Sequence, residues 1–374
     1  MNRYIDKQLY LSLMISFLMS FFVFKIFDNS FSLMRMAFAF SIFIFCFFYL
    51  KKIKTFNISY LYFLLFLIIF YRAIASDIHF IKLFFILSFF LMPILIQIMY
   101  APKNYQESIK LLFKNLYFLQ LFLSIFYCFT FDFTSRFSGY TNSATTYSIY
   151  LLSFFVGYIF TNKNRYILLH FLIVFFLIYI SQTRSTILLL VGIYFLFTLR
   201  NYVNKHLKLI SFLLLTLIMF LLPLTTIFSE NLNLMNRYED NSKDTSTLTR
   251  LSYFNNQVNA LSEFNTRDYL FGFGIDENKK VNSERYVLVS VDQHNDFFVL
   301  LYDYGIIVLI LFIYLIVIKI NSTFSLAFSL VYFSSFYHNM LYDFWLIIFF
   351  HISSHYFLNR KSLNYAFNKK RIFI

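Results

Sequence analysis

Long apolar runs constrain this chain more than any other feature of its sequence. Most of them extend over about 17 to 22 residues, enough for an α-helix to cross the hydrocarbon core of a bilayer. Only 13% of the 374 residues are charged, against about a quarter in soluble domains, so the chain cannot cover a globular surface with polar side chains. Inside lipid, every backbone N–H and C=O must be bonded within its own segment, so the runs predict helices.

The predicted fold class is all-α: a polytopic membrane helix bundle of about twelve transmembrane helices with a large, partly helical outer loop. We expect residues 1–228 to hold nine spans, residues 229–296 to form that loop, and residues 297–374 to hold three more spans and a basic tail. The expected spans are Leu9–Phe27, Phe31–Leu50, Ile58–Tyr71, Phe80–Tyr100, Leu111–Phe131, Ala144–Phe160, Tyr166–Ile180, Ser185–Leu199, Leu209–Phe228, Phe297–Ile318, Thr323–Tyr337 and Leu341–Leu358.

The lysines and arginines of the short loops predict the orientation of these spans. With the N-terminus inside, the inner loops and the C-terminal tail carry most of the cations, whereas the short outer loops hold only Arg72, Arg136 and Arg184. Both termini are therefore expected in the cytoplasm. The loop over residues 229–296 then lies outside, and its own cations do not contradict this, because long loops translocate largely regardless of charge.

The outer loop contains a predicted helix with an apolar stripe that would dock on the membrane domain. Arg250 lies at the edge of this stripe and would face the membrane surface, although a solvated helix charge is the ordinary alternative. The residues of the stripe recur at helical spacing: Leu248, Leu251, Phe254, Val258 and Leu261.

Arginine is the cation of the short outer loops, whereas the inner loops prefer lysine. The rigid guanidinium fork matches phosphate oxygens and stays charged beside lipid. Arg136 and Arg184 each flank a predicted span, which makes them candidate anion ligands. The alternative for each is an arginine that anchors a helix end by snorkelling. Arg72 and Arg267 are weaker candidates.

A polar run stands where the outer loop re-enters the membrane: His294, Asn295 and Asp296. Histidine titrates near neutral pH and can accept a proton from a substrate hydroxyl. A structural histidine is the alternative, and His338 is a weaker candidate of the same kind.

Several classes of chemistry lack support in the sequence. Both cysteines lie inside apolar runs, and no Walker, HExxH or GxSxG motif occurs, so we expect no metal site and no cofactor. The glycine-rich run 271–274 follows no strand and predicts a turn rather than a nucleotide loop. The net charge of +14 does not predict a nucleic acid partner, because the excess is spread over short loops instead of one patch.

Six short motifs follow one another along the chain: RFSG at 136–139, TRST at 183–186, RLSY at 250–253, LFGFG at 270–274, HNDF at 294–297 and YGI at 304–306. Their order, the long outer loop and the helix count together resemble the O-antigen polymerase and O-antigen ligase superfamily of bacterial inner membranes. The resemblance covers roughly residues 136–310.

This resemblance implies a glycosyltransferase that acts on the periplasmic side and takes its donor glycan from undecaprenyl pyrophosphate. By motif, Arg184 and Arg250 correspond to the functional arginines of the family and His294 to its histidine. Arg136 and Asn295 are expected to contribute to substrate binding. Fixed arginines could then stand in for a metal in neutralising the leaving pyrophosphate.

Three functions remain open at this point. A polymerase would transfer the growing O-antigen or capsule chain to the next lipid-linked repeat unit, and a ligase would transfer it to lipid A–core. Tyr253 and Phe254 occupy positions where a tryptophan is common in the ligase, which favours the polymerase. A flippase for lipid-linked oligosaccharides also has about a dozen spans, but the long loop argues against it. Expected partners are the lipid-linked glycan and membrane lipid, with a chain-length regulator as a further candidate.

Overall fold

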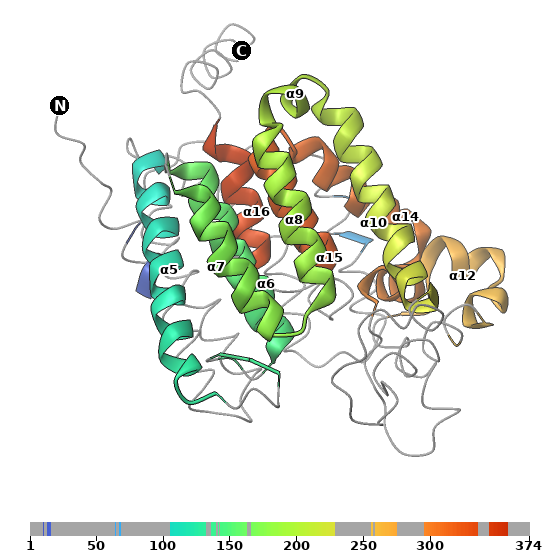
Figure 1. The fold of residues 1–374 in the computed structure, drawn as a ribbon. Helices are drawn as coiled ribbons and strands as arrows, with labels where there is room; N and C mark the ends of the chain where they lie inside the picture. Colours follow the sequence, from blue (N-terminus) through green and yellow to red (C-terminus); the bar gives the residue numbers. More distant parts are fainter. Residues whose placement is uncertain are drawn as a thin grey trace, which may run out of the picture.

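The chain forms a bundle of α-helices in a computed structural model (Figure 1), and the described part contains no strand. That part comprises residues 105–131, 136–162 and 166–228 with small gaps, 259–274, 295–335 and 344–357, and isolated positions elsewhere. Its helices are α5 (Tyr105–Cys128), α6 (Ala144–Thr161), α7 (Ile167–Ile180), α8 (Arg184–Thr198), α9 (Arg200–Lys205), α10 (Leu207–Phe228), α12 (Thr266–Phe271), α14 (Asp296–Lys319), α15 (Thr323–Ser335) and α16 (Phe344–Tyr356).

Helices form where the apolar runs predict them. Each expected span from the fifth to the twelfth overlaps one helix, and most boundaries agree within a few residues. By length and composition α5, α6 and α14 can each cross a membrane. The shorter apolar helices are α7, α8, α15 and the stretch Leu207–Ile218 of α10. Apart from isolated positions, the first four expected spans lie outside the described residues, so the count of twelve stays a prediction.

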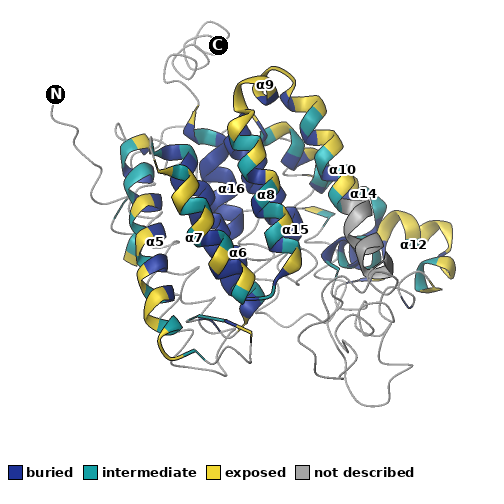
Figure 2. Ribbon diagram, viewed as in Figure 1, coloured by how far each residue is buried: buried dark blue, intermediate teal, exposed yellow. Residues whose placement is uncertain are grey.

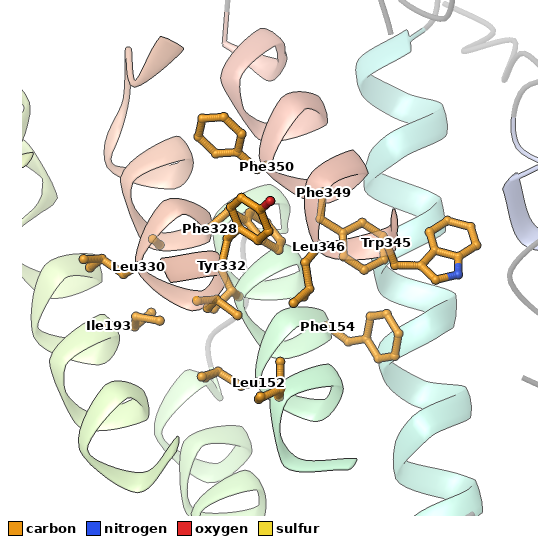
Figure 3. Packing of buried hydrophobic residues seen from close by; sticks show 14 of the residues in the cluster. Leu152, Phe154, Ile193, Phe328, Leu330, Tyr332, Trp345, Leu346, Phe349 and Phe350 are labelled. Carbon is orange, nitrogen blue, oxygen red and sulfur yellow. The ribbon is translucent and has the colours of Figure 1, made fainter. Parts of the chain in front are cut away.

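The core of the bundle lies around α6 and α15. Helix α15 packs against α6, α8, α10 and α16, while α6 also contacts α5 and α7. Aromatic rings fill the space between these helices (Figure 3). The ring of Phe113 lies 5.7 Å from that of Phe328 and 5.5 Å from that of Phe349. It comes so close to α6 that a Cβ on Gly157 would lie 2.0 Å from it, so a larger residue there would force the ring to shift.

The outward faces of the peripheral helices are apolar. Figure 2 shows exposed residues along the outside of α5, α7, α8 and α10. Phe122 on α5 is 66% exposed, and similar large apolar side chains are exposed on the other helices: Leu172, Phe176, Leu188, Phe195, Phe212 and Leu213. A soluble protein rarely exposes so extensive an apolar surface. The bundle is therefore a membrane domain whose outer faces contact lipid.

One end of the bundle, which we call the α9 end, is closed by side chains that cap helix C-termini. Lys208 Nζ donates to the carbonyl oxygens of Val317 and Ile320 at 3.0 and 2.8 Å. Gln106 Nε2 donates to the carbonyl of Tyr356 at 2.6 Å. These bonds satisfy carbonyls that the helices themselves leave without partners.

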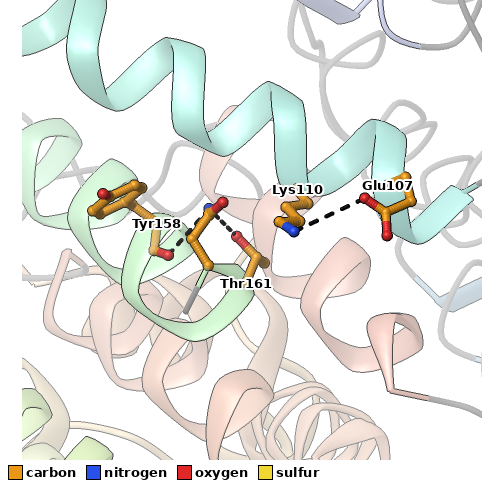
Figure 4. Close-up of polar contacts among 5 residues, drawn as sticks. Glu107, Lys110, Tyr158 and Thr161 are labelled. Carbon is orange, nitrogen blue, oxygen red and sulfur yellow. Dashed lines mark hydrogen bonds and ion pairs between the residues drawn. The ribbon is translucent and has the colours of Figure 1, made fainter. Parts of the chain in front are cut away.

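Polar contacts within α5 and within the end of α6 also lie at the α9 end (Figure 4). Glu107 and Lys110 form an ion pair at 3.9 Å. Close by, Asn162 Nδ2 donates to Thr161 Oγ1 at 2.9 Å. The described cations here are mainly lysines: Lys110, Lys114, Lys205, Lys208 and Lys319, with Arg200.

Helix α14 differs from the predicted span Phe297–Ile318 in one respect. The backbone at Gly305 has φ 84° and ψ 171°, so the helix is broken there instead of running through without interruption. A glycine can adopt this conformation because it has no Cβ. The run's apolar composition predicted its length, but composition does not reveal a break that depends on one glycine.

Candidate functional site

Arg136 contacts the turn that leads to Arg184, at the end of the bundle opposite the α9 end. Arg136 Nε donates to the carbonyl of Ser181 at 3.3 Å, and the neighbouring Phe137 N–H donates to the carbonyl of Ile180 at 3.2 Å. Arg184 begins α8 three residues later. Both arginine side chains are exposed. The fold thus brings together two predicted site residues from separate connections, and we call this region the arginine end.

The turn between α7 and α8 is tightly held. Gln182 has a φ of 56°, a left-handed conformation that allows the chain to reverse within a few residues. The hydroxyls of Ser181 and Thr183 are hydrogen-bonded at 2.7 Å. The Thr186 hydroxyl in the first turn of α8 lies 3.2 Å from that of Ser148 on α6. These contacts fix the backbone that carries Arg184.

The electrostatics of this turn favour an anion. Arg184 is the first residue of α8, and the first turn of the helix contains no acidic residue. A helix N-terminus carries a partial positive charge, so a cation placed there is unfavourable for the helix on its own. An anion bound at this point would interact with the guanidinium and with the helix dipole together.

Phe137 anchors the segment that carries Arg136. Its ring is 1% exposed and lies edge-to-face with Phe131 at 4.9 Å and with Tyr147 at 5.0 Å. Gly139 has a φ of 56°, and a Cβ there would lie 2.6 Å from the Tyr147 ring. The segment therefore holds its aromatic residue inside the bundle and its arginine outside.

Asn295 has a clear structural role. Its side-chain oxygen accepts hydrogen bonds from the backbone N–H groups of Phe297 and Phe298, at 3.1 and 3.3 Å. It is thus the N-cap of α14, and it fixes the start of that helix at Asp296. Substrate binding by Asn295 stays a prediction.

The remaining candidates divide into two groups. Arg267 is exposed on α12, which begins with a capping box between Asn265 and Asp268. Four candidates lie outside the described residues: Arg72, Arg250, His294 and His338. Within the described part of the chain, no group of three or more His, Cys, Asp or Glu could hold a metal ion.

The run 271–274 forms the predicted turn, with Gly272 at a φ of 70°. Sequence reasoning missed what this turn contacts. It packs against α14 at the break, and the N–H of Phe273 donates to the carbonyl of Tyr302 at 2.8 Å. The only available signal was a pair of glycines, Gly272 and Gly305, that have no role in a regular helix.

Comparison with known proteins agrees with the resemblance of the motifs. Residues 169–313 match the family model described as O-antigen ligase. This segment extends from α7 into α14 and contains Arg184, Arg267 and Asn295, while Arg136 lies before it. No curated protein and no solved structure matches the chain.

Proposed function

Since residues 169–313 match the family model described as O-antigen ligase, we propose that the chain is a member of the O-antigen polymerase and ligase superfamily and polymerises lipid-linked oligosaccharide repeat units of an O-antigen or capsule. The growing glycan is transferred from undecaprenyl pyrophosphate to the next lipid-linked repeat. The observation that carries this proposal is the hydrogen bond from Arg136 to the turn that leads into α8, the helix that begins with Arg184. Two guanidinium groups beside a helix N-terminus suit a pyrophosphate.

The proposed orientation places the arginine end in the periplasm and the α9 end in the cytoplasm. The described cations support it, because six lysines and arginines lie at the α9 end and only three, Arg136, Arg184 and Arg267, at the other. Positive charge concentrates on the cytoplasmic side of membrane proteins. On this arrangement the protein is a multi-pass inner-membrane protein with about twelve spans, both termini cytoplasmic, and residues 229–296 form a periplasmic loop.

The proposed reaction is a direct displacement at the anomeric carbon. The acceptor hydroxyl oxygen forms the new glycosidic bond while the bond to the pyrophosphate breaks, and its electron pair leaves with the pyrophosphate. Arg184 and Arg250 stabilise that charge, with Arg136 assisting, so neither ATP nor a metal is required. His294 accepts the hydroxyl proton, and the configuration at the anomeric carbon is inverted.

A ligase that transfers the glycan to lipid A–core is the second candidate, because the matching family model carries the description O-antigen ligase. Deleting the gene separates the candidates. Loss of a polymerase leaves single repeat units on the cell surface. Loss of a ligase leaves lipid A–core bare while lipid-linked chains accumulate, and loss of a flippase leaves no repeats outside.

We expect single repeats in the deletion strain and long chains again when the intact gene is restored. Bare lipid A–core would overturn the polymerase assignment. An epitope inserted between residues 229 and 296 should be accessible from the periplasm. Accessibility from the cytoplasm alone would exclude the proposed orientation and the reaction with it.

A further inference from the structure

Two glycines hold the turn 271–274 against α14. A Cβ on Gly305 would lie 2.3 Å from the carbonyl oxygen of Leu270 and 2.6 Å from the N–H nitrogen of Phe271. A Cβ on Gly272 would lie 2.6 Å from the backbone of Asp303 and Tyr304. Each glycine thus makes room for the backbone around the other. We call this contact the glycine interlock; Figure 1 shows α12 beside the start of α14.

The interlock also provides hydrogen bonds that the broken helix lacks. At Gly305 the backbone leaves the helical region, so carbonyls just before it lose their usual donors one turn later. The N–H of Phe273 donates to the carbonyl of Tyr302 at 2.8 Å, and the N–H of Gly274 donates to that of Asp303 at 3.1 Å. The turn from the outer loop therefore completes the hydrogen bonding of α14.

Aromatic packing extends the contact beyond the two glycines. The rings of Phe273 and Tyr302 stack at 5.0 Å. Phe264 packs against both, at 4.9 and 5.3 Å, and Phe298 lies 5.2 Å from Tyr302. This cluster ties the described part of the outer loop to the first half of α14, the half that begins beside His294.

We propose that Gly272 and Gly305 are positioning residues for the transfer reaction. They seat the turn 271–274 in the break of α14 and so fix the direction of residues 296–304, at whose start the predicted substrate-binding residue Asn295 stands. Arg184 lies on α8, outside this assembly. The interlock therefore positions the start of α14, with its N-cap Asn295, relative to the arginines without contributing to the pyrophosphate site. The inference rests on the proposed function for its catalytic consequence, but its structural part stands alone.

Hydrogen exchange on the full-length protein in nanodiscs tests the structural part. Gly305→Ala and Gly272→Ala should each speed exchange at the N–H groups of Phe273 and Gly274 by about tenfold or more, because both hydrogen bonds are lost. Gly192→Ala is the matched control, since a Cβ on Gly192 in α8 meets nothing within 4 Å. Unchanged exchange in Gly305→Ala and Gly272→Ala would overturn the interlock.

Polymerisation by purified protein with a synthetic lipid-linked repeat tests the catalytic part. In Gly305→Ala, kcat per folded molecule should fall about 100-fold, since small misplacements of reacting groups reduce rates by that order, while KM for the donor changes little. Gly157→Ala disturbs the core beside Phe113. It should reduce the yield of folded protein without changing kcat per folded molecule.

The outcomes separate the two proposals. Faster exchange in Gly305→Ala with an unchanged kcat would overturn the positioning role while leaving the proposed function intact. An intact protein that forms no polymer under any condition would overturn the proposed function, and the exchange result would still decide whether the interlock exists.

Discussion

The two ends of the bundle are built in opposite ways. At the α9 end, side chains such as Lys208 and Gln106 donate to the last carbonyls of neighbouring helices. All the left-handed backbone positions among the described residues lie towards the arginine end: Gly139, Gln182, Gly272, Gly274 and Gly305. Unusual backbone conformations tend to cluster where a protein binds or reacts. The contrast agrees with the proposal that the reaction takes place at the arginine end and not at the α9 end.

The largest expected effect is on stability at the arginine end. Phe137→Ala removes a buried ring and leaves a cavity, which should lower the free energy of unfolding by about 3 to 5 kcal/mol. Unfolding of the purified protein in detergent measures it. Phe122→Ala is the control, because that ring is 66% exposed towards lipid and its loss leaves no cavity. Equal losses in both variants would show that Phe137 is not an anchor.

The second effect is catalytic and compares arginines that each begin a helix. Arg184→Ala should reduce chain extension about 100-fold or more, as removing one charge-stabilising donor does elsewhere. Arg200→Ala, at the start of α9, should leave chain length unchanged. The distribution of glycan lengths on gels measures both.

Arg184→Lys sharpens the same comparison, because lysine keeps the charge but loses the planar fork. We expect only partial recovery of chain length. Glycan chains of full length in the Arg184→Ala variant would show that Arg184 is not part of the site.

A smaller effect is expected at the α9 end. Lys208→Met keeps most of the side chain's length but removes its bonds to the carbonyls of Val317 and Ile320. The free energy of unfolding should fall by about 1 kcal/mol, the usual net value of such bonds at a partly exposed site. Glycan chain length should not change. A loss of polymerisation at unchanged stability would contradict the division between the two ends.

The smallest effect concerns the turn between α7 and α8. Gln182→Gly relieves a left-handed residue, so stability should rise by up to about 1 kcal/mol after allowing for the flexibility that glycine adds to the unfolded chain. Gln182→Ala keeps the same strain and should change stability little. Thermal unfolding of the unmodified protein and the two variants gives their order of stability. A Gln182→Gly variant less stable than the unmodified protein would show that the backbone at Gln182 is not strained.

The sequence predicted the helices well and the site in part. Apolar runs located α5 to α8, α10 and α14 to α16, because the bilayer thickness imposes a length on each run. Arg136 and Arg184 stood out by residue type and position. That Arg136 contacts the carbonyl of Ser181 could not be predicted, since the two residues are 45 positions apart and no local pattern joins them. The break in α14 could not be predicted either, because Gly305 there contacts Leu270 and Phe271, which are distant in the sequence.

The sequence by itself determined which segments are helical, which faces are apolar and which cations stand at the ends of spans. These properties depend on neighbouring residues and on the solvent around them, so they can be deduced from local order. Only the tertiary structure decided that the turn at Gly272 fits into α14 at Gly305, and that two arginines share one turn. Such contacts depend on the shapes of surfaces distant in the chain, and those surfaces exist only once the helices have packed.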